Sequence, residues 1–266
     1  MARALQFVTI AGLSIGAAGA AAPDVSAMNQ PHKPFQIYGN TYYVGMSGIA
    51  SVLVTSDYGH VLVDTGLPES AAMIAKNIQE LGFQLQDVKA IVFSHAHPDH
   101  VGGAAELQRL TGAQVYALRP AEPVLRTGKL SRDDPQYSTK STLPKVERVW
   151  VATDGQLLGV GGIRLRVYAT PGHTPGSATW TWDACEGSKC LNFVYADSLT
   201  PVASGKYKFK DHPQMLEGFE QSFAVLERIP CQLLMVPHPD AALLGRLEGA
   251  KGDADALTDE GACKAF

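Results

Sequence analysis

The sequence has little charge and no basic stripe. Charged residues make up 18% of its 266 residues, the formal net charge is −4, and the lysines and arginines are scattered. Nucleic-acid binding requires clustered cations, so this distribution argues against a nucleic-acid partner. Neither a sequence repeat nor a low-complexity linker interrupts the chain after its first 20 residues. These absences favour a single α/β domain over residues 21–266.

The N-terminus carries a mostly apolar stretch, residues 4–17, that is too short to span a bilayer well. Arg3 precedes this stretch, and Ala18-Gly19-Ala20 offers a small-residue cleavage site after it. A buried N-terminal helix is the alternative, but the stretch has no amphipathic period. We therefore expect residues 1–20 to be a secretory signal peptide. The mature protein would then be periplasmic and retain no membrane span.

Cysteine is rare, with four residues in the chain. None of them lies beside a histidine cluster, which argues against a thiolate metal site. An even count in an exported protein indicates two disulfides, and four cysteines allow three pairings. Cys185 and Cys190 flank a polar turn between two apolar runs, as the two strands of a hairpin would. We therefore expect a Cys185–Cys190 bond, with Cys231 and Cys263 tying the C-terminal tail to the body.

Histidine is also scarce, yet three of the eight lie within six positions. The cluster directly follows the apolar run 91–93 and reads Ser94-His95-Ala96-His97-Pro98-Asp99-His100. Imidazole and carboxylate are the ligands that suit Zn²⁺ when no thiolate is present. Each residue alone could be an ordinary loop residue, and Asp99 could be a helix N-cap. Together they predict a metal site.

The spacing within the cluster suggests two neighbouring metals. His95 and His97 are two residues apart at a strand end, so both side chains point the same way. Pro98 ends the strand, so Asp99 and His100 are aimed differently, at the start of a helix.

Two further histidines, His173 and His238, lie in loops that follow predicted strands. They complete a set of five histidines and one aspartate, or three ligands per metal. Such sites leave a position open for water or substrate, as catalytic zinc sites do. Two zinc ions about 3.5–4 Å apart can share a hydroxide, so the predicted reaction is metal-assisted hydrolysis. The remaining histidines are expected to be surface or structural residues: His32, His60 and His212.

The hydrophobic pattern alternates between strand and helix periods. We expect strands at 42–44, 50–54, 60–64, 90–93, 114–118, 163–170, 177–182 and 232–236. We expect helices at 69–82, about 100–110 and 215–229. Residues 119–145 contain four prolines and no clear period. We expect them to form a long surface loop of the kind that is often functional.

In the order and spacing of these motifs, the sequence resembles members of the metallo-β-lactamase superfamily. The resemblance rests on His-x-His-x-Asp-His followed by Gly-Gly, then Gly-His-Thr, then a late histidine. It implies an α/β fold, an αβ/βα sandwich of two β-sheets flanked by helices. Asp64, in Val63-Asp64-Thr65-Gly66, matches the early aspartate that supports the metal site from behind its ligands.

Other segments resemble class B, subclass 3 metallo-β-lactamases, over nearly the whole mature chain. They are residues 34–40, 43–45, 134–136, 196–200 and 238–239. The resemblance implies two Zn²⁺ per chain. It assigns the first zinc to His95, His97 and His173, and the second zinc to Asp99, His100 and His238.

The resemblance also implies what the site does. Asp99 would be the catalytic carboxylate, and Ser198, Thr200 and Gln136 would contact substrate or ordered water. Ser198 stands where other subclasses place a cysteine ligand. The implied activity is hydrolysis of the β-lactam amide of antibiotics by a zinc-bound hydroxide, without a covalent intermediate. The implied enzyme is a monomer that acts on a small-molecule substrate and confers antibiotic resistance.

Two other interpretations remain open. One is another hydrolase of the same fold, a glyoxalase II type thioesterase or a lactonase, in which an aspartate bridges the metals. Asp197 lies close to that position, but neighbouring residues of a strand face opposite sides, and we expect Ser198 to face the site. The other is a non-catalytic metal-storing protein, which the open ligand positions disfavour.

Overall fold

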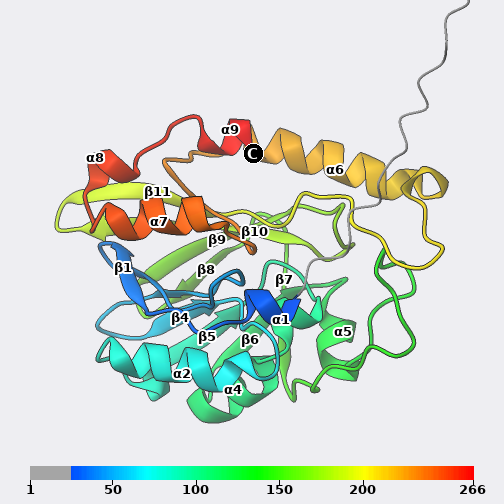
Figure 1. The fold of residues 1–266 in the computed structure, drawn as a ribbon, viewed down its shortest axis with the longest axis horizontal. Helices are drawn as coiled ribbons and strands as arrows, with labels where there is room; N and C mark the ends of the chain where they lie inside the picture. Colours follow the sequence, from blue (N-terminus) through cyan, green and yellow to red (C-terminus); the bar gives the residue numbers. More distant parts are fainter. Residues whose placement is uncertain (1–24) are drawn as a thin grey trace, which may run out of the picture.

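The computed structural model describes residues 25–266, and the expected signal peptide, residues 1–20, lies outside them. Two β-sheets pack against each other, with helices on their outer sides (Figure 1). Helices α2 (Ser70–Glu80) and α4 (Ala104–Thr111) cover the first sheet, and α6 (Pro213–Leu226) lies beyond the second (Figure 1). The predicted αβ/βα sandwich is therefore confirmed. Among the described residues, no helix is both long enough and apolar enough to cross a membrane.

The first sheet has seven strands that lie in chain order. Strands β1 to β4 pair antiparallel, whereas β4 to β7 run parallel. The strands are β1 (Phe35–Tyr38), β2 (Thr41–Tyr43), β3 (Val52–Val54), β4 (His60–Val63), β5 (Val88–Val92), β6 (Gln114–Leu118) and β7 (Val149–Ala152).

The second sheet has five strands in the order β12-β11-β10-β9-β8. The strands are β8 (Leu157–Val160), β9 (Ile163–Ala169), β10 (Ala178–Glu186), β11 (Lys189–Tyr195) and β12 (Leu233–Met235). Strand β10 is antiparallel to both β9 and β11, and β11 is parallel to β12. Strands β9, β11 and β12 therefore run in the same direction and end at the same edge.

The other helical segments are short. They are α1 (Val25–Met28), α3 (Pro98–Val101), α5 (Glu122–Thr127), α7 (Ala241–Gly249), α8 (Ala254–Leu257) and α9 (Ala262–Ala265), with 3₁₀ turns η1 (Leu85–Asp87) and η2 (Phe209–Asp211). Helix α5 corrects our expectation for residues 119–145, which contain this helix as well as irregular chain. Pro123 did not prevent it, because proline is tolerated in the first turn of a helix.

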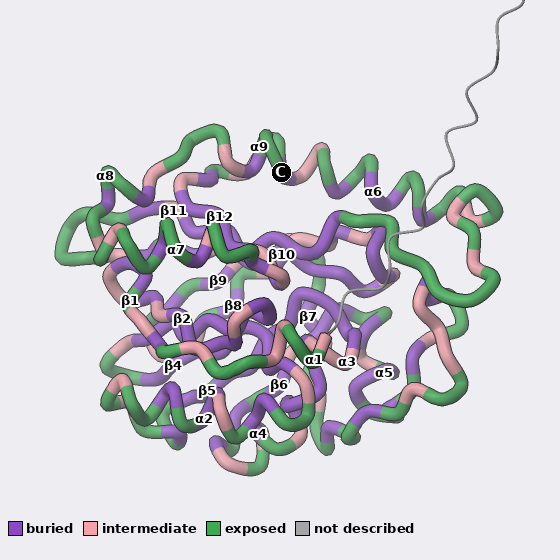
Figure 2. The backbone as a smooth tube through the Cα atoms, viewed as in Figure 1, coloured by how far each residue is buried: buried purple, intermediate pink, exposed green. Residues whose placement is uncertain are grey.

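The central strands are buried on both faces (Figure 2). In β3, Val52 and Val54 pack into the core between the sheets, whereas Leu53 packs into the core beneath the helices. Side chains alternate along a strand, so one strand serves two cores. Fully burying one such side chain contributes about 1.5–3 kcal/mol. The first sheet is thus packed on both faces, and the loop with His95, His97 and His100 follows its strand β5.

The helix expected near residues 100–110 is interrupted at Gly102 and Gly103. A side chain at Gly102 would lie 2.5 Å from Pro68, and one at Gly103 would lie 2.4 Å from the carbonyl oxygen of Thr65. Glycine therefore lets the junction between α3 and α4 pack directly against the loop after β4. This contact brings the histidine cluster close to Asp64.

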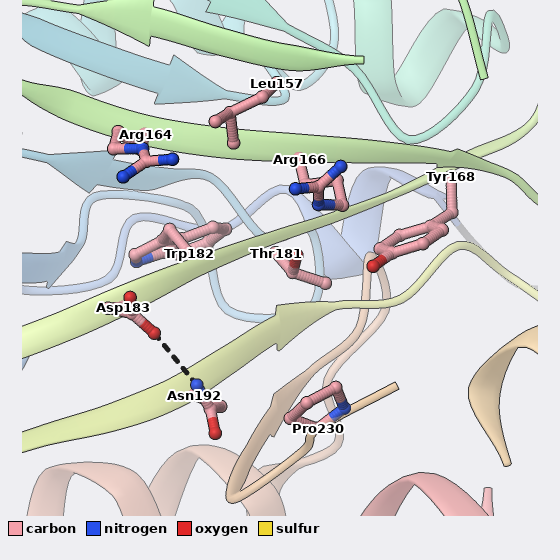
Figure 3. Close-up of a pocket in the computed structure, with 9 residues that line it drawn as sticks. All are labelled: Leu157, Arg164, Arg166, Tyr168, Thr181, Trp182, Asp183, Asn192 and Pro230. Carbon is pink, nitrogen blue, oxygen red and sulfur yellow. Dashed lines mark hydrogen bonds between the residues drawn. The ribbon is translucent and has the colours of Figure 1, made fainter. Parts of the chain in front are cut away.

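The outer face of the second sheet carries a pocket of about 300 Å³ (Figure 3). Arg164, Arg166 and Tyr168 of β9 point into it, whereas Ile163, Leu165 and Val167 of the same strand pack into the core between the sheets. The strand alternation thus separates this pocket from the inner core. None of the clustered histidines lines it.

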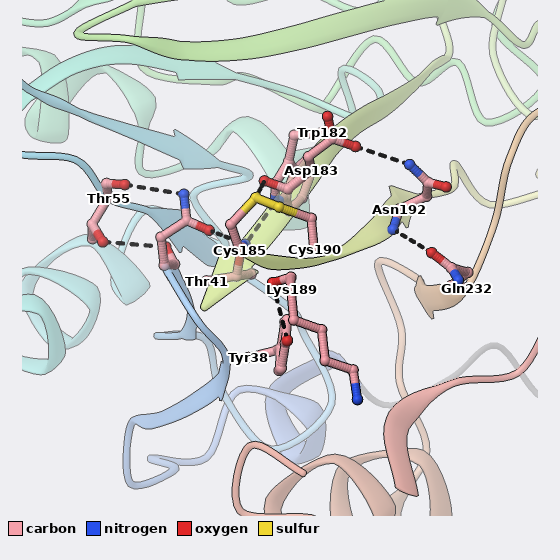
Figure 4. The surroundings of a disulfide bond; sticks show 11 residues. Tyr38, Thr41, Thr55, Trp182, Asp183, Cys185, Lys189, Cys190, Asn192 and Gln232 are labelled. Carbon is pink, nitrogen blue, oxygen red and sulfur yellow. Dashed lines mark hydrogen bonds between the residues drawn. A yellow bond between two sulfur atoms is a disulfide. The ribbon is translucent and has the colours of Figure 1, made fainter. Parts of the chain in front are cut away.

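Both expected disulfides are present. Cys185 and Cys190 face each other across the β10–β11 hairpin (Figure 4), and Cys231–Cys263 joins α9 to the start of β12. The hairpin is also held by a hydrogen bond from the Tyr38 hydroxyl to the carbonyl oxygen of Lys189, at 3.2 Å.

Candidate metal centre

The predicted metal ligands, and the two aspartates beside them, lie in loops that each follow the carboxyl end of a strand. Asp64 follows β4, the run 94–100 follows β5, His173 follows β9, Asp197 follows β11, and His238 follows β12. Strands β4 and β5 are parallel, as are β11 and β12, so their loops meet at shared sheet edges. Sites in α/β folds occur at such carboxyl ends.

The structure brings the predicted ligands into two groups of three. His95, His97 and His173 form the first group, in which each offers one ligand atom within 4.8 Å of the others. All three are buried. The ring centroids of His95 and His173 are 4.6 Å apart, and those of His97 and His173 are 5.0 Å apart. The three imidazoles therefore surround one small volume.

Asp99, His100 and His238 form the second group, again with ligand atoms within 4.8 Å of one another. The Nε2 atoms of His100 and His238 are 3.0 Å apart. Oδ2 of Asp99 lies 3.4 Å from the first of these atoms and 3.3 Å from the second. The rings of His95 and His100 are 4.2 Å apart, so the two groups are neighbours.

Each histidine of the first group is held from behind by a hydrogen-bond acceptor. Nδ1 of His95 donates to Oδ1 of Asp197 at 2.7 Å. Nε2 of His97 donates to the carboxylate of Asp134, at 3.0 and 3.1 Å from its two oxygens. Nδ1 of His173 donates to the main-chain carbonyl of Thr200 at 2.8 Å. All three partners lie in segments that resemble subclass 3 enzymes, 134–136 and 196–200, but nothing in the sequence predicted that they would hold the histidines.

The second group is held in the same way. Nδ1 of His100 donates to Oδ2 of Asp64 at 3.1 Å, and Nδ1 of His238 donates to the carbonyl of Gly48 at 3.1 Å. Metal-binding histidines almost always donate their other ring nitrogen in this manner, which fixes the tautomer and the ring orientation.

The pattern of unpaired atoms fits a metal. Nε2 of His95 is buried, and within residues 25–266 it has no hydrogen-bond partner. A buried polar atom without a partner costs about 1–3 kcal/mol, and a metal ion would satisfy it. Five imidazoles and a carboxylate, with no thiolate in either group, also match the ligand preference of Zn²⁺.

Asp64 supports the centre from the strand behind it. Its backbone has φ +58°, a conformation that costs a non-glycine residue free energy and that clusters at functional sites. Its carboxylate accepts hydrogen bonds from the main-chain N–H and the hydroxyl of Ser94, at 2.7 and 2.6 Å. The Tyr195 hydroxyl donates to it at 2.9 Å. Together with the bond from His100, four donors orient this one carboxylate.

Burial and charge act differently on the two groups. Burial, reinforced by neighbouring imidazoles, lowers the pKa of His95 well below its usual value and that of His173 to about 4. Burial also opposes charge on His100, but the carboxylates of Asp99 and Asp64 outweigh it and raise its pKa to about 10. The second group therefore favours positive charge, which a bound cation would supply.

The residues expected to contact substrate lie around the centre in different ways. Gln136 places Nε2 3.4 Å from Nδ1 of His97 and lines a pocket of about 300 Å³ together with Asp99. Thr200 reaches the site through its carbonyl oxygen, while its side chain is exposed. Strand β11 ends at Tyr195, so the strand alternation that we expected to separate Ser198 from Asp197 does not apply, and both side chains are buried. Asp197 itself belongs to neither ligand group.

Comparison with known proteins identifies the family of this chain. Residues 44–185 match the family model described as the metallo-β-lactamase superfamily. The solved structure of the Rm3 metallo-β-lactamase is 47% identical, with a TM-score of 0.87, and the match covers 92% of this chain and 93% of that one. The chain therefore belongs to the metallo-β-lactamase superfamily.

Two further structures agree. The metallo-β-lactamase SMB-1 is 42% identical with a TM-score of 0.86, covering 90% of this chain and 93% of that one. MEM-A1, a subclass B3 metallo-β-lactamase from a soil metagenome library, is 41% identical with a TM-score of 0.85, covering 90% of this chain and 92% of that one. Within the superfamily, the chain belongs to subclass B3.

Curated relatives are more distant. A hydroxyacylglutathione hydrolase of Rhodopseudomonas palustris (strain BisB5) is 28% identical over 173 residues, or 62% of this chain and 56% of that protein. The uncharacterized protein YobT of Bacillus subtilis (strain 168) is 30% identical over 145 residues, or 53% and 59%. The chain thus spans less than two thirds of the length of these relatives.

Proposed function

We propose that this protein hydrolyses the amide bond of β-lactam antibiotics with two bound Zn²⁺ ions. His95, His97 and His173 would hold the first ion, and Asp99, His100 and His238 the second. The observation that carries the proposal is the pair of adjacent three-ligand groups at the edge of the sandwich. Its support from known proteins is the likeness to β-lactamases of 41–47% identity over nine tenths of the chain.

When bound, the two ions would lower the pKa of water to about 7 and polarise the substrate carbonyl. The protein prepares this chemistry with fixed side chains. One ring nitrogen of each of these histidines is engaged in a hydrogen bond, which leaves the other ring nitrogen to bind an ion once any proton on it has been displaced. Asp99 is the one carboxylate of the two groups, and its position also suits orienting the attacking water by accepting its proton in a hydrogen bond.

The substrate would enter beside Gln136. The pocket of about 300 Å³ places apolar Leu67 and Leu130 next to polar Gln136 and Asp99. An apolar wall with a few polar groups is typical of small-molecule sites. We propose that the Gln136 amide contacts a polar group of the β-lactam, and that Ser198 and Thr200 contact substrate or ordered water. No covalent intermediate is needed.

The alternative of a glyoxalase II type thioesterase is weaker. It requires an aspartate that bridges the metals, and Asp197 is the candidate by position. Its Oδ1 instead accepts the hydrogen bond from the outer nitrogen of His95. The curated thioesterases match only about three fifths of the chain, at 28–34% identity.

We further propose a single catalytic domain over residues 21–266, made as a periplasmic, monomeric enzyme after removal of residues 1–20. The two disulfides support an oxidising compartment. Size-exclusion chromatography and sequencing of the exported N-terminus test these statements.

The decisive experiment is hydrolysis of a chromogenic cephalosporin by the purified protein, with metal content measured on the same sample. We expect two Zn²⁺ per chain, loss of turnover with a chelator, and recovery when Zn²⁺ is returned. A protein that carries two Zn²⁺ but does not open penicillins, cephalosporins or carbapenems would refute the proposed substrate class.

A further inference from the structure

Asp134 is not one of the six predicted ligands, yet its side chain is buried against one of them, His97. Its side chain is 5% exposed, and both of its oxygens lie within 3.1 Å of Nε2 of His97. Burying a carboxylate costs free energy unless hydrogen bonds satisfy it. Asp134 obtains these bonds from His97 and from the main-chain N–H of Gln136, which donates to Oδ1 at 2.8 Å.

The same short segment reaches both ring nitrogens of His97. Asp134 holds Nε2, and the side-chain amide of Gln136, two residues later, lies 3.4 Å from Nδ1. Nε2 is already used as a donor, so Nδ1 is the nitrogen left to face the first ligand group. The segment that lines the substrate pocket therefore also sets the orientation of a metal ligand.

This segment is itself anchored by main-chain hydrogen bonds. The N–H of Asp134 donates to the carbonyl of Ser131 at 3.1 Å, and the N–H of Tyr137 donates to the carbonyl of Asp134 at 3.0 Å. The N–H of Ser204 donates to the carbonyl of Pro135 at 3.0 Å, which links the segment to the loop after Thr200. The carboxylate is thus presented by a fixed turn.

We propose that Asp134 is a positioning residue that acts through His97 and Gln136 together. Its carboxylate holds the imidazole with Nδ1 toward the first metal, raises the basicity of that nitrogen, and fixes the backbone of Gln136 at the pocket. The proposal rests on the proposed metal centre. Loss of such a supporting partner typically weakens metal affinity or activity by about 10–100-fold.

The test compares Asp134→Ala and Asp134→Asn with the adjacent, exposed Asp133→Asn as a matched control. Metal-free protein is titrated with Co²⁺ while its visible spectrum is followed, and with Zn²⁺ in competition with a chromogenic chelator. No β-lactam is present, so the result does not depend on the proposed substrate. If the parent protein bound no metal, the proposed function would fail, and that failure is distinguishable from a failure of Asp134.

We expect Asp134→Ala to bind the first metal about 10–100-fold more weakly, with altered Co²⁺ absorption bands, and to leave the second site unchanged. Asp134→Asn should lose less, about tenfold, because its amide oxygen still accepts the N–H of His97 but carries no charge. Asp133→Asn should match the parent protein. First-site affinity and a Co²⁺ spectrum that stay unchanged in Asp134→Ala would overturn the proposal.

Asp134→Asn keeps the test decisive if the alanine variant does not fold. In that case an unchanged affinity and spectrum in Asp134→Asn would overturn the proposal.

A second measurement tests the link between Asp134 and Gln136. At saturating Zn²⁺, Asp134→Ala should change KM or kcat for a chromogenic cephalosporin in the same direction as Gln136→Ala, whereas only Asp134→Ala should also weaken binding of the first metal. Equal metal affinity in the two variants would contradict a role through His97.

Discussion

Oδ1 of Asp197 lies 2.7 Å from Nδ1 of His95, and both side chains are essentially fully buried. The aspartate therefore stands behind the first ligand group, on the far side of the imidazole from the nitrogen Nε2 that has no partner. An aspartate that bridged two metals would have to lie on the near side. The six predicted ligands are common to the β-lactamase and thioesterase interpretations, so they do not distinguish the two. The position of Asp197 does, and it favours the β-lactamase interpretation.

The first prediction concerns substrate choice. Because Asp197 supports His95 and belongs to neither ligand group, we expect hydrolysis of β-lactams and essentially none of lactoylglutathione. Parallel assays at equal enzyme and Zn²⁺ concentrations measure kcat/KM for both substrates. A preference for the thioester would restore the thioesterase interpretation.

The second prediction tests how the ligands divide between the two metals. His238→Ala should weaken the second site more than the first, because His95, His97 and His173 remain in place. Metal titration of the variant, with His32→Ala as a control outside both groups, measures this difference. Equal weakening at the two sites would contradict the division.

Asp99→Asn provides the third prediction. The variant should keep the fold, since asparagine has nearly the same shape, but lose the charge that lies 3.3–3.4 Å from both Nε2 atoms of the second group. Metal catalysis is worth several kcal/mol, so we expect kcat to fall about 100-fold or more. Circular dichroism checks the fold, and the exposed Asp57→Asn serves as a control. Near-normal turnover would disprove the assigned role.

The grouping of the six candidate ligands was predictable from the sequence because most of their signal is local. His95, His97, Asp99 and His100 fall within six residues, and the two late histidines each follow a predicted strand. The outer partners have no such signal. Asp134, Asp197 and the carbonyl of Gly48 reach their histidines across 37, 102 and 190 residues of chain, so only tertiary structure reveals them.

The secondary structure was likewise predictable only where the signal in the sequence is local and strong. The central strands were predictable from apolar runs, and helix 69–82 appears as α2 with Gly82 at φ +90° after its end. Strands β1, β7 and β8 and helices α5 and α7 were missed, because strands of four residues and short helices give too few apolar positions to establish a period. The interruption between α3 and α4 depends on the close approach of Pro68 to Gly102, which periodicity cannot report.

The fourth prediction ranks the two disulfides. Cys231–Cys263 spans 32 residues, whereas Cys185–Cys190 spans 5. In the chain-entropy model the longer loop contributes about 4 kcal/mol to the free energy of unfolding and the shorter loop about 2 kcal/mol. Chemical denaturation of the two double-alanine variants measures the difference. If loss of the hairpin bond proved more harmful, the ranking by loop length would be wrong.

The last prediction separates substrate contacts from metal ligands. Gln136→Ala should keep both metals, because the amide lies 3.4 Å from His97 but is not among the grouped ligands. It should change KM, kcat or both, by an amount that depends on the class of β-lactam. Thr200→Ala should also keep both metals, because the group that holds His173 is a main-chain carbonyl that the substitution leaves in place. Metal analysis and steady-state kinetics on the same preparations test both variants. A loss of metal in Gln136→Ala would mean that this side chain supports the first site and is not primarily a substrate contact.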